Sequence, residues 1–568
     1  MKKYTLIGLL GLMVCSCFPE KPEEADLIFT NGVIYTVDES NPKVEAVAVK
    51  DGMILALGDS QDVLAHTGDH TEVMDLGGKT MTPGFIESHA HLMGIGYNKL
   101  ELDLMYVKTY DELVEKVAEA VEKAEPGDWI TGRGWHQDKW IEKPDKIVKG
   151  FQTNDPLNEV SPDNPVFLRH ASGHATFAND KALEMAGITN LTGERPGEVE
   201  GGEIIVDELG NPTGVLTERA SVLVERIVPD DTPERDEAAL ELALEELNQK
   251  GITSFHDAGS GQDVIDLVQK FKDEGRLTVR QYIMISSRQP DVMEAWYERG
   301  PMIDSADHML TVRSIKLHCD GALGPWGAWL LADYSDKKGH RGHETLPMDI
   351  VTEVSEKALE LGFQVCSHAI GDRANQEVLN RYESAFEKFP EVTDHRFRIE
   401  HAQHLHPDDI PRFGELGVIA AMQAIHLSSD RPWAIDRLGR RRVIDGAYVW
   451  QKIFQTGGRI CNGTDAPVEP VDPIPSFYAS VTRKTLERLP EGGYEGDQKM
   501  TREQALKSFT LDGAFAEFEE EFKGSIEIGK AADFTVFDKD IMTVPEDDIL
   551  DTQVEMTVVA GKVVYKAI

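Results

Sequence analysis

The 568-residue sequence predicts an α/β fold, namely a (β/α)8 barrel (a TIM barrel) with a small composite β-sandwich domain built from both chain ends. Three observations lead to this prediction. In the middle of the chain, helical segments repeatedly stop at a glycine, and an apolar, strand-like run follows at once. Both chain ends are rich in short strands and turns, and the middle is not. Several apolar runs end in histidine, lysine or aspartate, and a barrel brings the carboxyl ends of its strands to one face.

The first 17 residues resemble an export signal that is not part of the fold. Lys2 and Lys3 precede an apolar run from Leu6 to Val14, which is too short to span a bilayer and is typical of a signal-peptide core. The run leads to Cys17 in a pattern similar to a lipoprotein cleavage box. We therefore predict a lipoprotein signal peptide over residues 1–17 and lipidation of Cys17, so that the protein is exported and lipid-anchored in a bacterial cell envelope or periplasm. Plain secretion after cleavage nearby is the alternative.

The two chain ends, residues 25–81 and 524–568, are predicted to pair into one β-sandwich domain. Near the N-terminus, Asn31-Gly32 is a strong turn signal between two short apolar runs. Asp51-Gly52 lies at the tip of a second predicted hairpin. The strands predicted at the C-terminal end are Ala532–Phe537, Val554–Val559 and Val563–Tyr565.

Residues 82–523 are predicted to form the barrel. Three units in this range show a helix, a glycine and then a strand, which is the signature of a loop from helix to strand. They are Glu237–Gln249, Gly251 and Ile252–His256; Ile350–Leu361, Gly362 and Phe363–His368; and Asp408–Leu416, Gly417 and Val418–Met422. Repetition of this unit argues for parallel strands with crossover helices. The segment at about 129–219 is rich in Gly, Pro and Asn, and we predict that it is an insertion over the barrel mouth.

The first predicted barrel strand ends in His89 and His91. Side chains alternate along a strand, so both imidazoles point to the same side. Two neutral imidazoles that point the same way are suitable ligands for zinc or a similar ion. Because chance His-x-His pairs are common, the prediction of a metal site depends on the segments that follow.

Four later apolar runs also end in reactive side chains, namely Lys316, His368, His401 and Asp465. In a barrel these ends converge on one face, where they and the His-x-His pair supply four imidazoles, a lysine and a carboxylate. One or two divalent metal ions can share such a set if one group bridges them. A protonated lysine has no lone pair to donate, whereas a lysine carboxylated by CO2, a carbamate, offers two oxygens. The alternative for Lys316 is a salt bridge to Asp320 or Asp465.

Together these segments resemble the amidohydrolase superfamily, in particular amidohydrolase family 3, the branch that includes N-substituted formamide deformylase. The matching stretches occur in family order and are Thr82–His91, Lys316–Gly324, His368–Asp372, Arg398–Gln403, Gly463–Val468 and Gly524–Phe534. The resemblance implies a metal-dependent barrel with a composite β-sandwich. It also implies roles for six residues: His89 and His91 as strand-1 ligands, Lys316 as a bridging carboxylated lysine, His368 and His401 as strand-5 and strand-6 ligands, and Asp465 as metal ligand and catalytic acid/base.

Two positions depart from the family pattern. Glu87 stands where the family usually has Asp, but it lies outside the His-x-His pair, so we expect little effect. His318 replaces a more common apolar residue beside Lys316, where it is expected to make an extra polar contact. Some branches of the superfamily use one metal ion, so one or two ions are both compatible with the resemblance.

Four further residues are predicted to contact the substrate, two of them with a structural alternative. His174 lies in a segment that resembles a family segment lining the substrate pocket, or else it orders a loop. Trp135 lies in a similar segment, or else it belongs to the core. Gln423 and His426 follow another predicted strand. His256 also ends a strand, where it either supports the metal ligands from behind or packs structurally.

The predicted function is therefore that of a metal-dependent hydrolase, an amidohydrolase that cleaves the non-peptide carbon–nitrogen bond of a small-molecule N-acyl or N-formyl amide, with zinc as the expected metal. Asp465 takes a proton from a metal-activated water and delivers it to the leaving nitrogen. The bond class comes from the resemblance, because the same site could open esters or lactones. The alternative is a non-catalytic metal-binding lipoprotein that uses the barrel as a ligand-binding module, and it predicts that an essential group is lost. None is missing.

The composition limits the partners. The formal net charge is −42, from 58 Lys and Arg against 100 Asp and Glu, and a field of this sign repels phosphates, which argues against nucleic acid. No run other than the N-terminal one is apolar for long enough to suggest membrane insertion, so membrane contact is expected through the lipid anchor alone. Cys319, Cys366 and Cys461 lie in apolar runs and are expected to be buried small hydrophobes. An oligomer is compatible with the sequence.

Overall fold

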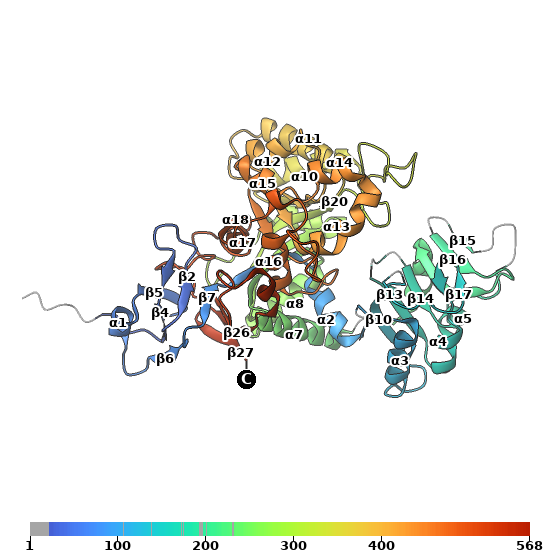
Figure 1. The fold of residues 1–568 in the computed structure, drawn as a ribbon, viewed down its shortest axis with the longest axis horizontal. Coiled ribbons are helices and arrows are strands. Elements are labelled where there is room, and N and C mark those ends of the chain that lie inside the picture. Colours follow the sequence, from blue (N-terminus) through green and yellow to red (C-terminus); the bar gives the residue numbers. More distant parts are fainter. Residues whose placement is uncertain are drawn as a thin grey trace, which may run out of the picture.

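A computed structural model describes residues 22–567 except for 106, 138, 172, 174, 192–196, 200–201 and 230–231. The predictions for residues 1–17, including Cys17, and for His174 lie outside the described residues. Figure 1 shows three parts: a central barrel, the sheets of the two chain ends on one side of it, and an inserted α/β unit on the other. Within the described part, no helix is long and apolar enough to cross a membrane.

The central part is a barrel of eight parallel strands, as predicted. In spatial order from the first they are β8 (Phe85–Ala90), β18 (Ile252–Ser260), β19 (Arg280–Ser286), β20 (Leu310–His318), β21 (Gln364–Ala369), β22 (Arg398–His401), β23 (Ile419–Met422) and β24 (Ile460–Asn462). The chain just beyond β24 joins the end of β8 through two backbone hydrogen bonds. The Asp465 N–H donates to the His89 carbonyl at 2.8 Å, and the His91 N–H donates to the Ala466 carbonyl at 2.7 Å.

Helices on the outside of the barrel alternate with these strands. They are α2 (Leu92–Leu100), α7 (Pro233–Gln249), α8 (Gln262–Asp273), α9 (Pro290–Arg299), α10 (Met348–Leu361), α11 (Asp372–Lys388), α12 (Ile410–Leu416), α13 (Ile425–Leu438), α14 (Arg440–Gly446), α15 (Trp450–Gln455), α16 (Pro473–Thr482), α17 (Arg502–Ser508) and α18 (Leu511–Ala516). All three predicted helix–glycine–strand units are present. Gly362 and Gly417 end their helices in the left-handed conformation, at φ of +82° and +65°, which glycine adopts without strain.

Side chains from strands and helices fill the space between them. Phe85, Ile283, Val365, Leu240 and Leu379 are fully buried in the largest apolar cluster. Helices α2 and α7 approach closely, because a Cβ at Gly96 would lie 1.9 Å from the Ala239 carbonyl oxygen. Burial of each large apolar side chain contributes about 1.5–3 kcal/mol, so this cluster is the main support for the barrel.

The chain ends form two sheets that share one core, which confirms the composite β-sandwich. The first sheet contains β5 (Met53–Gly58), β4 (Ala46–Lys50), β1 (Leu27–Thr30) and β6 (Glu72–Asp75). The second contains β27 (Lys562–Lys566), β26 (Val554–Val559), β25 (Phe534–Phe537), β7 (Thr80–Pro83), β2 (Val33–Tyr35) and β3 (Lys43–Val44). Antiparallel pairing of β25 with β7 joins the two ends of the chain. Phe29 and Phe534 meet edge to face between the sheets, with ring centroids 5.9 Å apart.

The turn signals in these ends had different outcomes. Asp51-Gly52 turns between β4 and β5 as predicted, with φ of +49° and +78°. Asn31-Gly32 does not close a hairpin, because β1 pairs with β4 and β6 whereas β2 pairs with β3 and β7 in the other sheet. The local signal for a turn was right, but the strand partners are chosen by long-range burial.

The inserted unit contains a seven-stranded mixed sheet in the order β15 (Glu198–Val199), β16 (Gly202–Val206), β17 (Pro212–Glu218), β14 (Ala175–Ala178), β13 (Val166–His170), β10 (Ile130–Trp135) and β9 (Leu102–Asp103). Its helices are α3 (Tyr110–Val121), α4 (Asp155–Val160), α5 (Asp180–Met185) and α6 (Val222–Glu225), and a short hairpin joins β11 (Ile147–Val148) to β12 (Phe151–Gln152). The unit therefore extends beyond the predicted range of about 129–219. Figure 1 shows it beside the barrel, next to α2. Arg235 of α7 and Arg169 of β13 both face Glu101 at this junction, at 3.1 and 3.6 Å.

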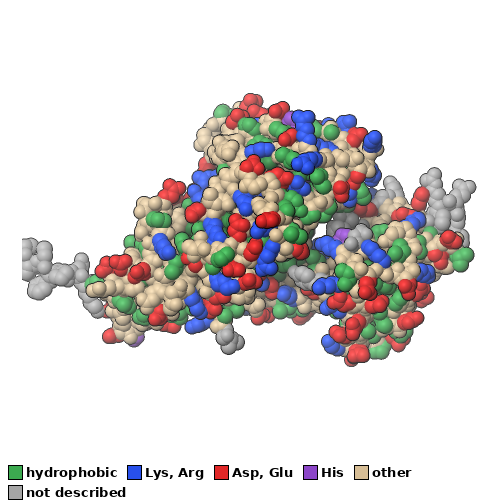
Figure 2. Space-filling view, viewed as in Figure 1, with side chains coloured by type: hydrophobic (Ala, Val, Ile, Leu, Met, Phe, Trp, Pro, Cys, Tyr) green, Lys and Arg blue, Asp and Glu red, His purple; other side chains and the backbone are tan. Residues whose placement is uncertain are grey.

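The surface explains the composition. Figure 2 shows Asp and Glu side chains spread over all three parts on the visible face, interspersed with Lys and Arg. The large negative charge is therefore carried by solvated faces rather than by one acidic tail. Cys319, Cys366 and Cys461 are free and buried, as expected.

Candidate metal centre

The His-x-His pair lies at the barrel mouth, where β8 ends. His89 is buried, and its Nε2 lies 3.6 Å from Oδ1 of Asp465. His91 is more exposed, and its Nε2 lies 3.3 Å from the same oxygen. The two imidazoles therefore face one carboxylate, as the strand alternation predicted.

Three buried groups are close enough to hold one ion. His89, His401 and Asp465 each offer a ligand atom, and these atoms lie within 4.8 Å of one another. His401 ends β22 and Asp465 follows β24, and both have left-handed backbones at φ of +75° and +60°. Non-glycine residues rarely adopt this conformation, and the strain is typical of positions where a side chain is aimed at a site.

The protonation of these groups suits a cation. Burial and the nearby Lys316 ammonium lower the pKa of His89 to about 4, and burial lowers the pKa of His401 well below its usual range, so both imidazoles are neutral near pH 7. Burial by itself would raise the pKa of Asp465, but the hydrogen bond from His91 and the neighbouring histidines hold it well below the ordinary value. Two neutral imidazoles and an ionised carboxylate are a donor set for zinc or a similar divalent ion.

His368 and Lys316 adjoin this set. The ring centroid of His368 lies 4.5 Å from that of His401, and its buried Nε2 lies 3.4 Å from Oδ1 of Asp320 without a hydrogen bond in the described chain. Nζ of Lys316 lies 3.4 Å from Nε2 of His89. Among the described residues, Lys316 forms no ion pair with Asp320 or Asp465, which were the alternatives considered. Asp320 instead accepts the backbone N–H groups of Trp329, Ile370 and Gly371.

A buried chain of side chains orients His89. Its Nδ1 donates a short hydrogen bond to Glu400, whose oxygens also accept from Arg398 Nε at 2.8 Å and Nη2 at 3.0 Å. Burial by itself would raise the pKa of Glu400, but Arg398 and His89 lower it to about 2. With Nδ1 occupied as a donor, Nε2 carries the lone pair that a cation needs. Sequence reasoning did not single out Arg398 or Glu400; a buried strand carrying an Arg and a Glu two residues apart was the available signal.

Glu87 has a different task. It accepts hydrogen bonds from the backbone N–H of His89 and from both the N–H and the hydroxyl of Thr464, each at 2.9 Å. Burial raises its pKa to about 8. Glu87 therefore links β8 to the loop after β24 by hydrogen bonds, and it is not one of the candidate metal ligands.

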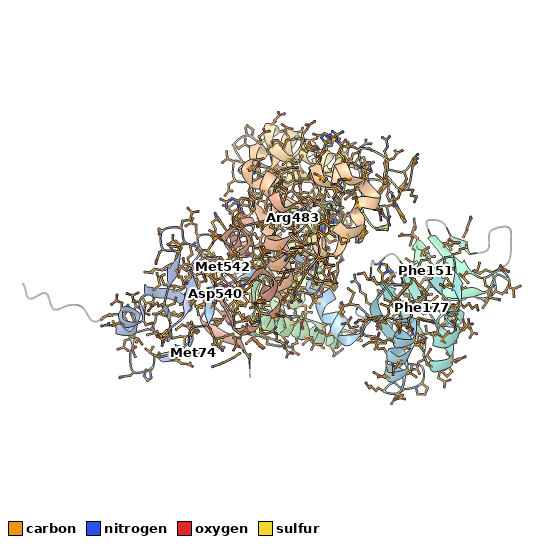
Figure 3. All side chains as sticks on the ribbon, in the orientation of Figure 1. Met74, Phe151, Phe177, Arg483, Asp540 and Met542 are labelled. Carbon is orange, nitrogen blue, oxygen red and sulfur yellow. The ribbon has the colours of Figure 1, made fainter. Side chains whose placement is uncertain are left out.

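The residues predicted to contact substrate lie in different places. Gln423 Oε1 accepts from His401 Nδ1 at 2.7 Å, so it orients a ligand. His426 lies beyond it, with its ring 6.2 Å from that of His401. Trp135 is fully buried in the inserted unit, where its indole N–H donates to the Leu168 carbonyl at 3.1 Å; this agrees with the core alternative. Its neighbour Phe177, labelled in Figure 3, packs against it with ring centroids 5.9 Å apart.

His318 and Arg133 complete the surroundings. His318 ends β20 and stacks on His368 with ring centroids 5.9 Å apart, but its Nδ1 has no hydrogen-bond partner within the described residues, so the extra contact expected of it is a ring contact. Arg133 extends from β10 of the inserted unit. Burial lowers its pKa, and the Asp465 carboxylate offsets part of that effect.

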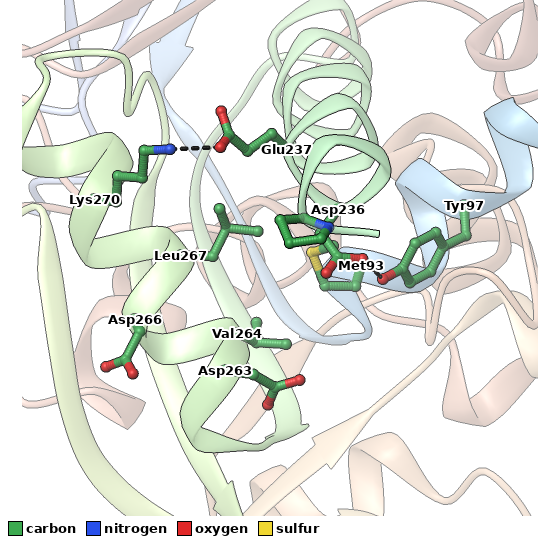
Figure 4. Close-up of a pocket in the computed structure, with 10 residues that line it drawn as sticks. Met93, Tyr97, Asp236, Glu237, Asp263, Val264, Asp266, Leu267 and Lys270 are labelled. Atoms are coloured by element: carbon green, nitrogen blue, oxygen red, sulfur yellow. Dashed lines mark hydrogen bonds and ion pairs between the residues drawn. The ribbon is translucent and has the colours of Figure 1, made fainter. Parts of the chain in front are cut away.

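A separate pocket of about 300 Å³ lies outside the barrel. Figure 4 shows it between α2, α7 and α8, where Tyr97 donates to Asp236 and Lys270 pairs with Glu237. None of the candidate metal ligands lines it. The chemistry therefore belongs to the mouth rather than to this groove.

The barrel and the buried His, His and Asp groups at its mouth define a class, that of metal-dependent hydrolases. A model of the amidohydrolase family matches residues 72–565, and the chain belongs to this family. YtcJ of Bacillus subtilis (strain 168) is 31% identical over 546 residues, which cover 95% of this chain and 99% of YtcJ. N-substituted formamide deformylase of Arthrobacter pascens is 28% identical over 557 residues, 95% and 98% of the two chains. An uncharacterized metal-dependent hydrolase from Pyrococcus horikoshii OT3 has a crystal structure with a TM-score of 0.73 and 28% identity, covering 92% and 99%.

Proposed function

We propose that the protein hydrolyses the non-peptide carbon–nitrogen bond of a small-molecule amide of the N-acyl or N-formyl type. The observation that carries the proposal is the position of Asp465, whose Oδ1 lies 3.3 Å from His91 Nε2 and 3.6 Å from His89 Nε2. Family membership supports hydrolysis. The relative named N-substituted formamide deformylase supports the bond class.

His89, His401 and Asp465 would hold a divalent ion, for which we propose zinc, and a bound ion would supply Lewis-acid chemistry and lower the pKa of water from ~15.7 to about 7. Asp465 is ionised at neutral pH, so it can accept the proton of the attacking water. The same carboxyl then delivers that proton to the leaving nitrogen, because a poor amine leaving group departs only when protonated. Gln423 and Glu400 keep the two imidazoles in place during both steps.

We also propose that Lys316 carries a carbamate. Burial lowers the pKa of its amine, although Glu400 and Asp465 oppose this, and the neutral amine is the form that reacts. Its nitrogen bonds to the carbon of CO2 and releases one proton, which leaves an anionic group with two oxygens. With His368 beside it, this group supports a second ion, so we propose two ions per chain rather than one.

The test is a metal analysis together with a turnover screen of matched amides, esters and lactones. We expect amide turnover that a chelator removes and zinc restores. Turnover of esters or lactones alone would overturn the bond class. Less than one ion per chain, with no turnover of any compound, would instead favour the binding-module alternative.

We further propose export and lipid anchoring at Cys17, which rests on the sequence pattern. Expression of the wild type and of Cys17→Ala in a bacterial host, followed by membrane fractionation, tests it. The wild type should sediment with membranes, and the variant should not.

A further inference from the structure

Three polar side chains at the barrel mouth have no part in the steps described above. His426 and Asp430 are four residues apart on α13, and Glu469 follows Asp465 by four residues. We call these three residues the mouth cluster. Because the His426 ring lies 6.2 Å from that of His401, the cluster begins one side-chain layer away from the candidate metal centre.

Among the described residues, neither carboxylate of the mouth cluster forms an ion pair. Asp430 accepts from Gln403 Nε2 at 3.1 Å and from the Ser429 hydroxyl at 3.4 Å, which are neutral donors. Lys139 of the inserted unit lowers the pKa of Asp430 and Glu469 from a distance, but in the described part of the chain neither forms an ion pair. Carboxylates this close to the protein interior are unfavourable until a cation or several donors reach them.

The imidazole of His426 is the third polar group of the mouth cluster. It is only 8% exposed, and its Nε2 has no hydrogen-bond partner among the described residues. Asp430 lies one helical turn after His426 on α13, so the two side chains share a face of that helix, and His426 lowers the pKa of both Asp430 and Glu469. A buried polar atom without a partner costs about 1–3 kcal/mol, and such atoms persist where a ligand satisfies them.

The geometry favours an organic cation over a metal ion. Of the described residues, His89, His401 and Asp465 bring their ligand atoms within 4.8 Å of one another, and the mouth cluster does not. A primary ammonium has three donors that diverge from one nitrogen, so it can donate to several acceptors at once. The net charge of −42 also draws cations toward the protein. Figure 2 shows the surface hollowed where the inserted unit meets the barrel.

We propose that the mouth cluster binds a primary ammonium group of the substrate, so that the preferred amides carry a positively charged amine a few bonds from the scissile carbon–nitrogen bond. Burial raises the pKa of both carboxyls, and a bound ammonium offsets this effect by stabilising their ionised forms. The inference rests on the proposed function for its statement that the bound molecule is a substrate. The recognition of the cation itself is independent of turnover.

The test compares three amides that differ only at the far end of a five-atom chain. N-acetyl-1,4-diaminobutane ends in an ammonium, N-pentylacetamide in a methyl group and N-acetyl-5-aminopentanoate in a carboxylate. Affinity for the full-length, zinc-loaded protein is measured by calorimetry for probes that are not hydrolysed, and kcat/KM is measured for those that are. The proteins are the wild type, Asp430→Asn, Glu469→Gln and, as a matched control, Asp436→Asn on the exposed face of the same helix.

We expect the cationic probe to be preferred over the neutral probe by about tenfold or more, since a hydrogen bond to a charged group contributes about 1.5–3 kcal/mol. Asp430→Asn and Glu469→Gln should each weaken the cationic probe about tenfold and leave the neutral probe within about twofold. The control should change neither. Equal preference for the cationic and neutral probes, equal losses for both in the two variants, or binding of none of the probes would overturn the inference. Cation preference without turnover of any probe would leave the inference intact and count against the proposed function; turnover without cation preference would do the reverse.

Discussion

Two buried histidines have similar neighbours but different roles. His89, at the barrel mouth, is a candidate metal ligand, and His256, deeper in the barrel, is a structural histidine. His89 donates through Nδ1 to Glu400, and its Nε2 faces Asp465 and Lys316. His256 accepts at Nδ1 from Arg398 Nη1 at 2.9 Å, and its Nε2 faces Glu517 at 3.3 Å. Both are fully or almost fully buried. The difference lies in what the second nitrogen faces: Nε2 of His256 faces Glu517, whereas Nε2 of His89 faces Asp465 and Lys316 at the candidate metal centre.

Arg398 joins the two histidines. Its guanidinium binds Glu400 on the mouth side and His256 on the other, and Nη2 also donates to the Ser88 carbonyl at 2.6 Å. Beyond His256, Glu517 pairs with Lys523 at 3.0 Å. The chain of contacts therefore runs from the metal ligands through the barrel. It teaches that residue type and burial do not separate a ligand from a structural histidine; the groups that its second nitrogen faces do.

The largest effect is expected at the mouth. Asp465→Asn removes the proton acceptor, and general acid–base catalysis contributes about 10²–10⁴-fold, so kcat should fall by about 10³-fold. Metal content by elemental analysis should stay above half of the wild-type value, since the amide oxygen and the histidines remain. Asp436→Asn is the control. Full turnover in Asp465→Asn would remove the acid/base role.

Breaking the link between the two regions should destabilise the whole barrel. Arg398→Met leaves Glu400 buried without its cation and His256 without its donor, and loss of one partner of a buried ion pair costs about 3–5 kcal/mol. Urea unfolding at pH 7 measures the change in the free energy of unfolding. As a control, Arg441→Met alters an arginine whose side chain is 94% exposed and should change it by less than about 0.5 kcal/mol. A loss below about 1 kcal/mol in Arg398→Met would contradict the central place given to this residue.

The deeper region should respond to acid. Burial by itself would raise the pKa of Glu517, but Lys523 and His256 lower it from 4.5 to about 2. A carboxyl whose pKa is lower in the folded state stabilises the protein at pH values above its unfolded-state pKa. The contribution of Glu517, about 3 kcal/mol, is therefore present above pH 4.5 and is lost as the pH falls toward 2. Urea unfolding of the wild type and Glu517→Gln should therefore differ most near neutral pH. Curves that stay parallel from pH 6 to pH 3.5 would show that Glu517 titrates normally.

The smallest expected effect is a loss of metal affinity that occurs at the mouth and not in the deeper region. Gln423→Leu removes the acceptor that orients His401, and loss of such a supporting hydrogen bond costs about 10–100-fold in metal affinity. Competition with a chelating dye measures that affinity. Glu517→Gln is the matched control in the deeper region and should leave zinc affinity within about twofold. An equal loss of affinity in both variants would mean that the regions are not distinct.

Much of this arrangement could be predicted from the sequence, and the limits follow from particular residues. Gly362 and Gly417 ended helices where expected, because a left-handed glycine is a local signal. Asn31-Gly32 is equally local, yet the strands on either side of it belong to different sheets. Trp135 was assigned by its motif, but its ring is held in the core of the inserted unit.

The ligand-type residues were found because each follows an apolar run, whereas Glu400 was not singled out and Gln423 was predicted to contact substrate rather than to support His401. The sequence around Glu400 and Gln423 does not indicate which histidine nitrogen each will contact. His368 was placed with the other ligands, and it lies beside them while remaining outside the set of three that converge within 4.8 Å. In the sequence, nothing distinguishes Asp430 and Glu469 from other acidic residues. The fold places α13 and the loop after β24, which carry them, at the barrel mouth.

The sequence by itself determined the eight-stranded barrel, the β domain shared by the two chain ends and the side chains at the strand ends, because glycine stops, strand alternation and apolar runs act over a few residues. Only the tertiary structure decided which nitrogen of each histidine faces the metal centre and which carboxylates form ion pairs. Those outcomes depend on contacts between residues hundreds of positions apart, such as His89 with Glu400, and on the cost of burying a charge without a partner.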